Sequence, residues 1–176
     1  MKNKIYKIKN EFRKAVDTAE ENLFVGKSGS FTMNCSYAEG IFYAMCCHGK
    51  MNDLPKDRLG KLCAYGNLIA NFNIIREIME VFERKEWIRI AAKMFESTMK
   101  DDSEETTLSS FAVAKGIIFV MQELGTLSNL DQHLVDVHRG MTRSMIELME
   151  ANDGFDDFIN SFIQGIDPEM DSYQPE

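Results

Sequence analysis

The apolar residues of this chain recur every three or four positions almost from end to end, and proline is nearly absent. This spacing places apolar side chains on one face of a helix, which completes a turn in about 3.6 residues. The three prolines, Pro55, Pro168 and Pro175, all lie near expected helix ends. The pattern therefore predicts an all-α, single-domain globular bundle of six or seven helices.

The length and composition of the chain agree with one helical domain. A chain of 176 residues, of which 44% are hydrophobic and 27% charged, can bury a core without disulfides or a structural metal. No internal repeat of solenoid length is visible. We expect residues 1–166 to form the domain and residues 167–176 to form an acidic, disordered tail.

The N-terminal part of the chain predicts one amphipathic helix and a loop. Over residues 3–24 a single stripe holds Ile5, Ile8, Phe12, Val16, Ala19 and Leu23. The next residues contain Gly-Lys-Ser-Gly-Ser from Gly26 onward, a composition typical of a flexible loop. We expect this loop to span residues 25–34 and the helical core to span residues 35–166.

Two further helices are expected before residue 100. Ser36 with Glu39 three residues later has the pattern of a capping box, so the first of them should begin at Ser36 and end at Gly49. A longer helix should begin at residues 55–57 and continue to about residue 85. We expect a bend at residues 84–86, followed by helical residues 87–99.

The second half of the chain predicts three more helices. The helix over residues 106–124 is apolar on nearly all sides, which is typical of a central, buried helix ending at Gly125. Ser128 and Asp131 should open the next helix, which ends near Ala151. A short final helix is expected over residues 155–166.

Targeting and membrane signals are missing from the sequence. No apolar run approaches the roughly 18 residues that a membrane span needs. The apolar residues near the N-terminus are separated by polar ones, so no continuous signal-peptide core exists. We therefore expect a cytoplasmic protein without a membrane span.

The cysteines and histidines do not form a recognisable metal site. Cys35, Cys46, Cys47 and Cys63 are expected to be free thiols, as is usual in reducing cytoplasm. Cys46 and Cys47 precede a histidine, but this spacing matches no ordinary zinc arrangement. His133 and His138 lie five positions apart, about 140° around a helix, and each is expected at the surface. We expect no metal and no cofactor.

One pattern of carboxylates is compatible with metal chemistry. Glu77 and Glu80 lie one helical turn apart, and Glu147 and Glu150 form a second such pair. Paired helical carboxylates can hold Mg²⁺. The pattern resembles the Glu-x-x-Glu pairs of all-α nucleotide pyrophosphohydrolases, and this resemblance implies Mg²⁺-dependent nucleotide hydrolysis. The second pair departs from that family's Glu-x-x-Asp, and nearby Arg76 fits an ordinary surface ion pair. We therefore assign no catalytic residue, and hydrolysis stays an alternative.

The two ends of the chain carry opposite charge. The first 14 residues hold Glu11 and six basic residues, which are Lys2, Lys4, Lys7, Lys9, Arg13 and Lys14. A basic helix can bind nucleic acid or an anionic surface, or pair with acidic groups of the same protein. Because the net charge of the chain is −8, we do not expect nucleic acid as the main partner, and binding through the basic helix stays an alternative.

The opposite end is strongly acidic. Residues 144–176 hold nine acidic residues and no Lys or Arg. Such a surface can imitate nucleic-acid phosphates or dock on a basic protein. The candidates for partner binding are Glu147, Glu150, Asp153, Asp156, Asp157, Asp167, Glu169 and Asp171.

Few other residues indicate function. Trp87, the only tryptophan, is expected at the edge of the core, although it can also anchor a partner. The twelve methionines are expected to fill the core, although Met-rich faces can form permissive binding grooves. We therefore expect a protein-binding module, not an enzyme, that acts as an adaptor, inhibitor or immunity-type protein. Its partner is expected to be another protein with a basic, nucleic-acid-binding surface, and a homodimer is a further expectation.

Overall fold

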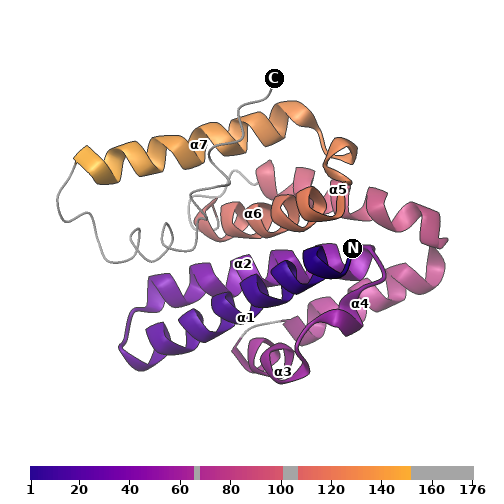
Figure 1. Cartoon of the computed structure of the whole chain (residues 1–176), viewed down its shortest axis with the longest axis horizontal. Helices are drawn as coiled ribbons and strands as arrows, with labels where there is room; N and C mark the ends of the chain where they lie inside the picture. The colour runs from indigo at the N-terminus through magenta and orange to yellow at the C-terminus, as the bar shows by residue number, and fades with distance from the viewer. Residues whose placement is uncertain (66–67, 101–106, 152–176) are drawn as a thin grey trace.

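Seven α-helices and three short 3₁₀ helices make up most of the residues that the computed structural model describes, which are 1–65, 68–100 and 107–151. The α-helices are α1 (Lys2–Phe24), α2 (Ser28–Cys47), α3 (Lys56–Tyr65), α4 (Leu68–Val81), α5 (Trp87–Met99), α6 (Thr107–Leu124) and α7 (Gln132–Ala151). The 3₁₀ helices are η1 (Met51–Asp53), η2 (Arg84–Glu86) and η3 (Leu127–Asn129). No strand occurs within these ranges, so the predicted all-α bundle is confirmed (Figure 1).

The core of the bundle forms where α2 packs against α6. Within α2, every residue from Met33 to Cys47 is buried except Glu39, which is half-buried. In α6, the apolar residues from Ile117 to Met121 are all buried, as the sequence predicted for a central helix. The two helices approach so closely that Gly40 lies against the backbone of Val113. The other helices pack around this pair, α1, α3, α4 and α5 on α2, and α1, α5 and α7 on α6.

Helix α1 covers one side of α2 and confirms the helix predicted over residues 3–24. Its buried stripe contains Ile8, Phe12, Val16 and Ala19. These residues advance by steps of three and four, so all four face the core. The amphipathic N-terminal segment thus forms a helix that packs on α2 through its apolar stripe.

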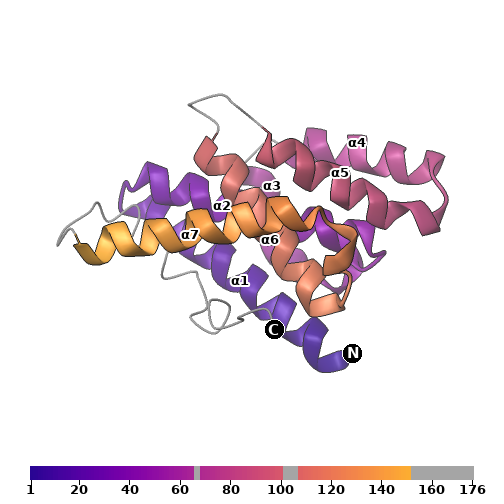
Figure 2. The same cartoon turned by 90° about the horizontal axis from the view of Figure 1, so that it is seen from above.

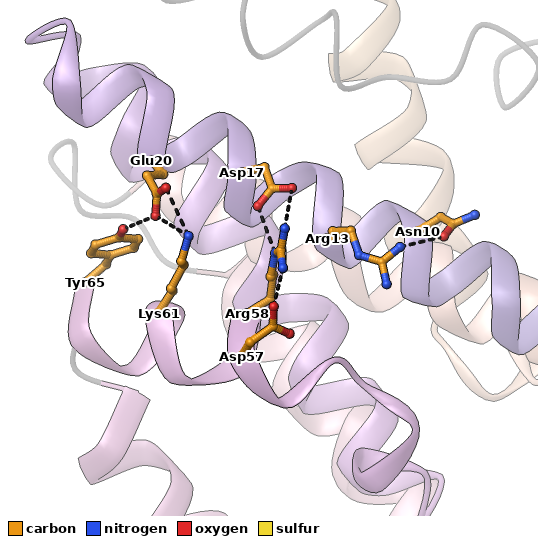
Figure 3. A network of polar contacts seen from close by, with 8 residues as sticks. All are labelled: Asn10, Arg13, Asp17, Glu20, Asp57, Arg58, Lys61 and Tyr65. Carbon is orange, nitrogen blue, oxygen red and sulfur yellow. Dashed lines mark hydrogen bonds and ion pairs between the residues drawn. The ribbon is translucent and has the colours of Figure 1, made fainter.

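A row of polar contacts joins α1 to α3 (Figure 3). Arg58 donates to both carboxylate oxygens of Asp17, at 3.0 and 3.3 Å. Glu20 pairs with Lys61 at 2.7 Å and accepts a hydrogen bond from the Tyr65 hydroxyl at 2.6 Å. The contact with Lys61 lowers the pKa of Glu20, while the bond to Glu20 raises the pKa of Tyr65 to about 12. Since these contacts are partly exposed, they orient α3 more than they stabilise it.

The loop predicted over residues 25–34 is wrong, because α2 already begins at Ser28. Gly26 has a φ of 75° and ends α1 with a Schellman pair, in which Lys27 N–H bonds to the Asn22 carbonyl and Gly26 N–H to that of Leu23. The chain then enters the next helix at once. The predicted capping box at Ser36 is wrong for the same reason, since Ser36 is a buried residue inside α2.

The single helix predicted from residues 55–57 to about 85 is also wrong, because α3 and α4 are separate helices. Helix α3 packs on α1 and α2, whereas α4 packs on α2 and on α3 itself. Between them the sequence has Gly66 and Asn67, two residue types that are poor helix formers. The prediction of one helix followed the apolar periodicity instead of this signal. The predicted bend at residues 84–86 is confirmed by η2.

Two helix ends of the second half, at Gly125 and Asp131, agree with the sequence. Gly125 ends α6 with a φ of 75°, and Thr126 N–H bonds to the Met121 carbonyl. Asp131 opens α7, where its Oδ1 accepts hydrogen bonds from the backbone N–H of His133 at 2.9 Å and of Leu134 at 3.3 Å. Ser128 instead belongs to η3, so it does not open α7.

The helix expected over residues 155–166 and the tail expected over residues 167–176 both lie outside the described residues. Within the described ranges, no helix combines the length and the apolar character that crossing a bilayer requires.

Candidate protein-binding surface

Helices α4 and α5 meet in a corner that lies at the right-hand end of the molecule in both Figure 1 and Figure 2. Helix α4 ends at Val81, and Glu83 has extended backbone angles, φ −64° and ψ 145°. The indole Nε1 of Trp87 donates a hydrogen bond to the Phe82 carbonyl at 3.1 Å. This bond satisfies a carbonyl that the end of α4 leaves without a helical partner and fixes the corner.

The corner exposes two adjacent apolar side chains. Val81 is 79% exposed and Phe82 is 46% exposed. Apolar residues that stand singly on a surface are ordinary, but here two are adjacent, and Phe82 lines a hollow that contains the further apolar side chains of Ile90 and Met94. The corner therefore has the form of a surface that another molecule can cover.

The inner hollow lies between the corner and the end of α2. It has a volume of about 420 Å³ and is lined by Cys46, Gly49, Met51, Asn52, Ile75, Arg76, Met79, Glu80, Arg84 and Trp87. Helix α4 provides Ile75 and Met79, while α2 and η1 provide Cys46 and Met51. Its walls are thus mainly apolar, and its polar side chains include Arg76, Glu80 and Arg84.

Arg84, Trp87 and Gly49 meet at one side of this inner hollow. The Arg84 guanidinium lies over the Trp87 ring, 5.9 Å from the ring centre, a cation–π contact. A Cβ atom on Gly49 would lie 3.0 Å from Arg84 Nη2 and 3.4 Å from Trp87 Cζ3. Gly49 also has a φ of 66° and ends α2 as the sequence predicted. The glycine therefore leaves room for the Arg84 and Trp87 side chains.

The outer hollow lies along α5. It has a volume of about 570 Å³ and is lined by Phe82, Glu86, Arg89, Ile90, Lys93, Met94 and Ser97. Phe82 lines this outer hollow, while Glu80 and Arg84, which lie close to the exposed pair along the chain, line the inner one. The corner with both hollows is called the α4–α5 corner below.

The carboxylates of the hydrolase hypothesis do not come together in the described part of the chain. Glu77 and Glu80 are exposed on α4, and Glu80 lies 3.8 Å from Arg76. Glu147 is exposed on α7, which lies on the opposite side of α2 and α6 from α4 (Figure 1). The side chain of Glu150 is outside the described residues. The hydrolase hypothesis stays a prediction.

The acidic candidates for partner binding fall mostly outside the described residues. This applies to Asp153, Asp156, Asp157, Asp167, Glu169 and Asp171. Glu147, on α7, is exposed to solvent. The acidic surface therefore stays a prediction from the sequence.

The basic residues of α1 are exposed, except Lys9, which is half-buried. Helical geometry places Lys4, Lys7 and Lys14 on one side of the buried stripe and Lys2, Lys9 and Arg13 on the other. Lys7 pairs with Glu123 of α6 at 2.8 Å, and Arg13 donates to Asn10 Oδ1 at 3.2 Å (Figure 3). The six side chains thus do not form one continuous face. Binding of nucleic acid through α1 stays a prediction.

The surface location expected for His138 is wrong, whereas His133 is exposed. His138 is 3% exposed and stacks on the Phe111 ring, with ring centres 4.0 Å apart and an angle of 11°. Its Nε2 lies 3.1 Å from the Phe111 carbonyl oxygen, which can only accept, so Nε2 carries the proton. Burial lowers the pKa of His138 to about 4. The helix pattern missed this residue because histidine, unlike leucine, gives no clear burial signal.

The four cysteines are free thiols, as predicted. Cys35, Cys46 and Cys47 are buried, and burial raises the pKa of each thiol. His48, beside them, bonds through its ring to the Ala44 carbonyl and to the Thr126 hydroxyl. In the ranges covered by the structure, no three His, Cys, Asp or Glu side chains gather as metal ligands would.

The sequence did not single out Val81, Phe82 and Arg84 as candidate site residues. Phe82 falls within the long helix expected from residues 55–57 to about 85, which the structure divides in two and ends at Val81. A usable signal was present, because Val81 and Phe82 directly precede four charged residues, 83–86. Trp87 is half-buried and packs against the core, in agreement with the expected core edge, and it also lines the inner hollow.

None of the three comparisons with known proteins, namely family models, curated sequences and solved structures, finds a match for this chain.

Proposed function

We propose that this protein is a protein-binding module of the adaptor or inhibitor kind, and that the α4–α5 corner is its docking surface. The observation that carries the proposal is the exposure of the adjacent residues Val81 and Phe82, of which Phe82 lines the outer hollow. Covering these two side chains would remove apolar area from water. The favourable free energy is roughly 25 cal/mol per Å² of buried apolar area, from which the costs of association are subtracted. A protein partner with apolar side chains between polar ones fits this surface.

The methionine side chains that line the hollows support binding of a partner through a surface that can adjust its shape. Met51 and Met79 line the inner hollow, and Met94 lines the outer one. Methionine side chains are flexible and polarisable, so they adjust to the shape of an inserted group. Charged residues surround the apolar centre, among them Arg89 and Lys93 on the outer side. An apolar centre within a polar rim is the usual arrangement of a protein interface.

The charge of the chain supports a basic partner. The net charge is −8, and residues 144–176 hold nine acidic residues without any Lys or Arg. The net charge of the whole chain would speed the encounter with a basic protein, including one that binds nucleic acid. The α4–α5 corner, whose hollows are lined by more basic than acidic side chains, would supply apolar contact rather than charge pairing. A cytoplasmic location fits the four free thiols. A second copy of the chain is the other candidate occupant of the corner.

The proposal is tested by comparing three tagged proteins in capture from the native lysate at moderate salt. These are the wild type, the double variant Val81→Ser/Phe82→Ser, and the control Val137→Ser, whose residue on α7 is 39% exposed. The wild type and the control should capture the same protein partner. The double variant should capture it at least about tenfold less, as expected for central contact residues.

The outcome that contradicts the proposal is equal capture of that partner by the double variant and the wild type. Circular dichroism and thermal unfolding show whether the double variant is folded, and its exposed positions predict little change in stability. Sedimentation of the purified protein distinguishes a second copy from a different partner. If Val81→Ser/Phe82→Ser converts a dimer to a monomer, the corner is a homodimer interface and the adaptor proposal fails.

A further inference from the structure

The inner hollow of the α4–α5 corner has the properties of a small-molecule site, in addition to its place beside the exposed pair. Its volume of about 420 Å³ lies within the range of about 300–1,000 Å³ that is usual for such sites. Cys46 and Ile75 at its wall are buried, and Met51, Met79 and Trp87 are half-buried. Apolar walls of this kind accept an aliphatic or aromatic group.

Arg84 places a positive charge at one side of the hollow. Its guanidinium is held over Trp87, at the side of the hollow where Gly49 leaves room. Among the residues that the structure describes, no carboxylate lies within ion-pair distance of Arg84. Of the described residues that line the hollow, Glu80 alone carries a carboxylate, and it lies 3.8 Å from Arg76. The charged groups of the hollow therefore sum to a positive charge, with Arg84 available.

We propose that the inner hollow binds a small apolar carboxylic acid, with its hydrocarbon part against Met79, Ile75 and Trp87 and its carboxylate on Arg84. An arginine can hold a carboxylate by two parallel hydrogen bonds, and this contact strengthens beside apolar walls. A neutral molecule of the same length would gain only the apolar contacts. A cation of that length would meet the positive charge of Arg84 and Arg76.

The sole tryptophan of the chain makes this site measurable without a label. Because Trp87 lines the hollow, its fluorescence reports occupation of this site. The purified full chain is titrated with decanoate, decan-1-ol and decylammonium, each below its micelle concentration. We expect saturable binding of decanoate, at least about tenfold tighter than that of decanol, and the weakest binding for decylammonium.

Two arginine variants test the assignment of Arg84. Arg84→Gln removes the cation from an exposed side chain and should reduce the affinity for decanoate to that for decanol. The control Arg89→Gln changes an exposed arginine of the outer hollow and should leave decanoate binding unchanged. Met79→Phe fills part of the inner hollow and should weaken decanoate and decanol alike. This third variant checks that the hydrocarbon part occupies the same hollow.

The inference is overturned if decanoate does not saturate the Trp87 signal, if decanoate and decanol bind equally, or if Arg84→Gln binds decanoate as the wild type does. It does not rest on the protein-binding proposal. The ligand titration uses the isolated protein, and Val81→Ser/Phe82→Ser leaves the lining of the inner hollow unchanged. Loss of partner capture with intact decanoate binding, or the reverse, therefore separates the two.

Discussion

Gly116 of α6 lies directly against the backbone of Ile41 in α2. A Cβ atom built on Gly116 would lie 2.7 Å from the Ile41 amide nitrogen, closer than side-chain atoms pack in proteins. Gly40 has the reciprocal position, since its Cβ would lie 2.9 Å from the Val113 carbonyl carbon. The close approach of the two central helices at these positions thus requires the absence of a side chain from both.

The first prediction concerns this helix crossing. Gly116→Ala should lower the free energy of unfolding by about 3 kcal/mol, because the added methyl group meets backbone atoms that cannot move aside. Gly40→Ala should act in the same direction. The measurement is urea-induced unfolding followed by circular dichroism.

Gly60→Ala and Gly140→Ala are matched controls for this prediction. Both glycines lie in helices with no atom near the added Cβ, so alanine should stabilise each helix by about 0.5–1 kcal/mol. Equal effects of alanine at Gly116 and Gly140 would contradict the close crossing of α2 and α6.

The second prediction concerns pH. Burial lowers the pKa of His138 to about 4, so the native state stays neutral at pH values where the unfolded chain binds a proton. The stability that depends on neutral His138 is complete above pH about 6.5 and is lost as the pH falls toward about 4, with a ceiling of about 3 kcal/mol. The measurement is the free energy of unfolding of the wild type and of His138→Gln across this range.

His138→Gln should be less stable than the wild type at neutral pH, because it loses the stacking on Phe111. The difference between the two proteins should shrink as the pH falls from about 6.5 to about 4. His133→Gln, at an exposed position, is the control and should follow the wild type throughout. A difference between His138→Gln and the wild type that does not change with pH would contradict the buried neutral state.

The third prediction concerns thiol reactivity. Burial raises the pKa of Cys35 and Cys47 to about 12 and raises that of Cys46 as well, so these thiols stay protonated and covered at neutral pH. Cys63 on α3 is partly exposed. Ellman's reagent should therefore react fast with one thiol of the native protein and slowly with the rest. Cys63→Ser should remove the fast reaction, and a fast phase that persists in this variant would show that another thiol is open to solvent.

Periodicity predicted the helices whose burial is one-sided or complete. The stripe from Ile8 to Ala19 gave α1, and the apolar residues around Ile117 gave α6, because burial follows the spacing of apolar side chains. Gly49 and Gly125 marked helix ends for a separate reason, since a left-handed residue closes the last turn at little steric cost. In α1 and α6, and at Gly49 and Gly125, the local sequence pattern and the burial in the structure therefore indicate the same helices and helix ends.

Errors arose where local composition and burial conflict. Ser30, in a segment with the composition of a loop, is 1% exposed inside α2, because the helix packs against its neighbours from its first turns. The α4–α5 corner was only partly foreseen: the bend was predicted, but the exposure of Val81 and Phe82 depends on which helices α4 and α5 contact. The hollow beside Arg84 joins residues from α2, η1, α4, η2 and α5, so it follows from the arrangement of helices, which spacing along the chain does not determine.

The measurement that tests the docking surface most directly is site-specific photo-crosslinking in the native lysate. A photoreactive benzoylphenylalanine replaces Phe82 in one protein and Val137 in another. Both side chains are exposed, but Phe82 lies at the α4–α5 corner and Val137 lies on α7. We expect a discrete crosslinked protein from position 82 and none from position 137. Absence of an adduct at position 82, or the same adducts from both positions, would contradict binding through the α4–α5 corner.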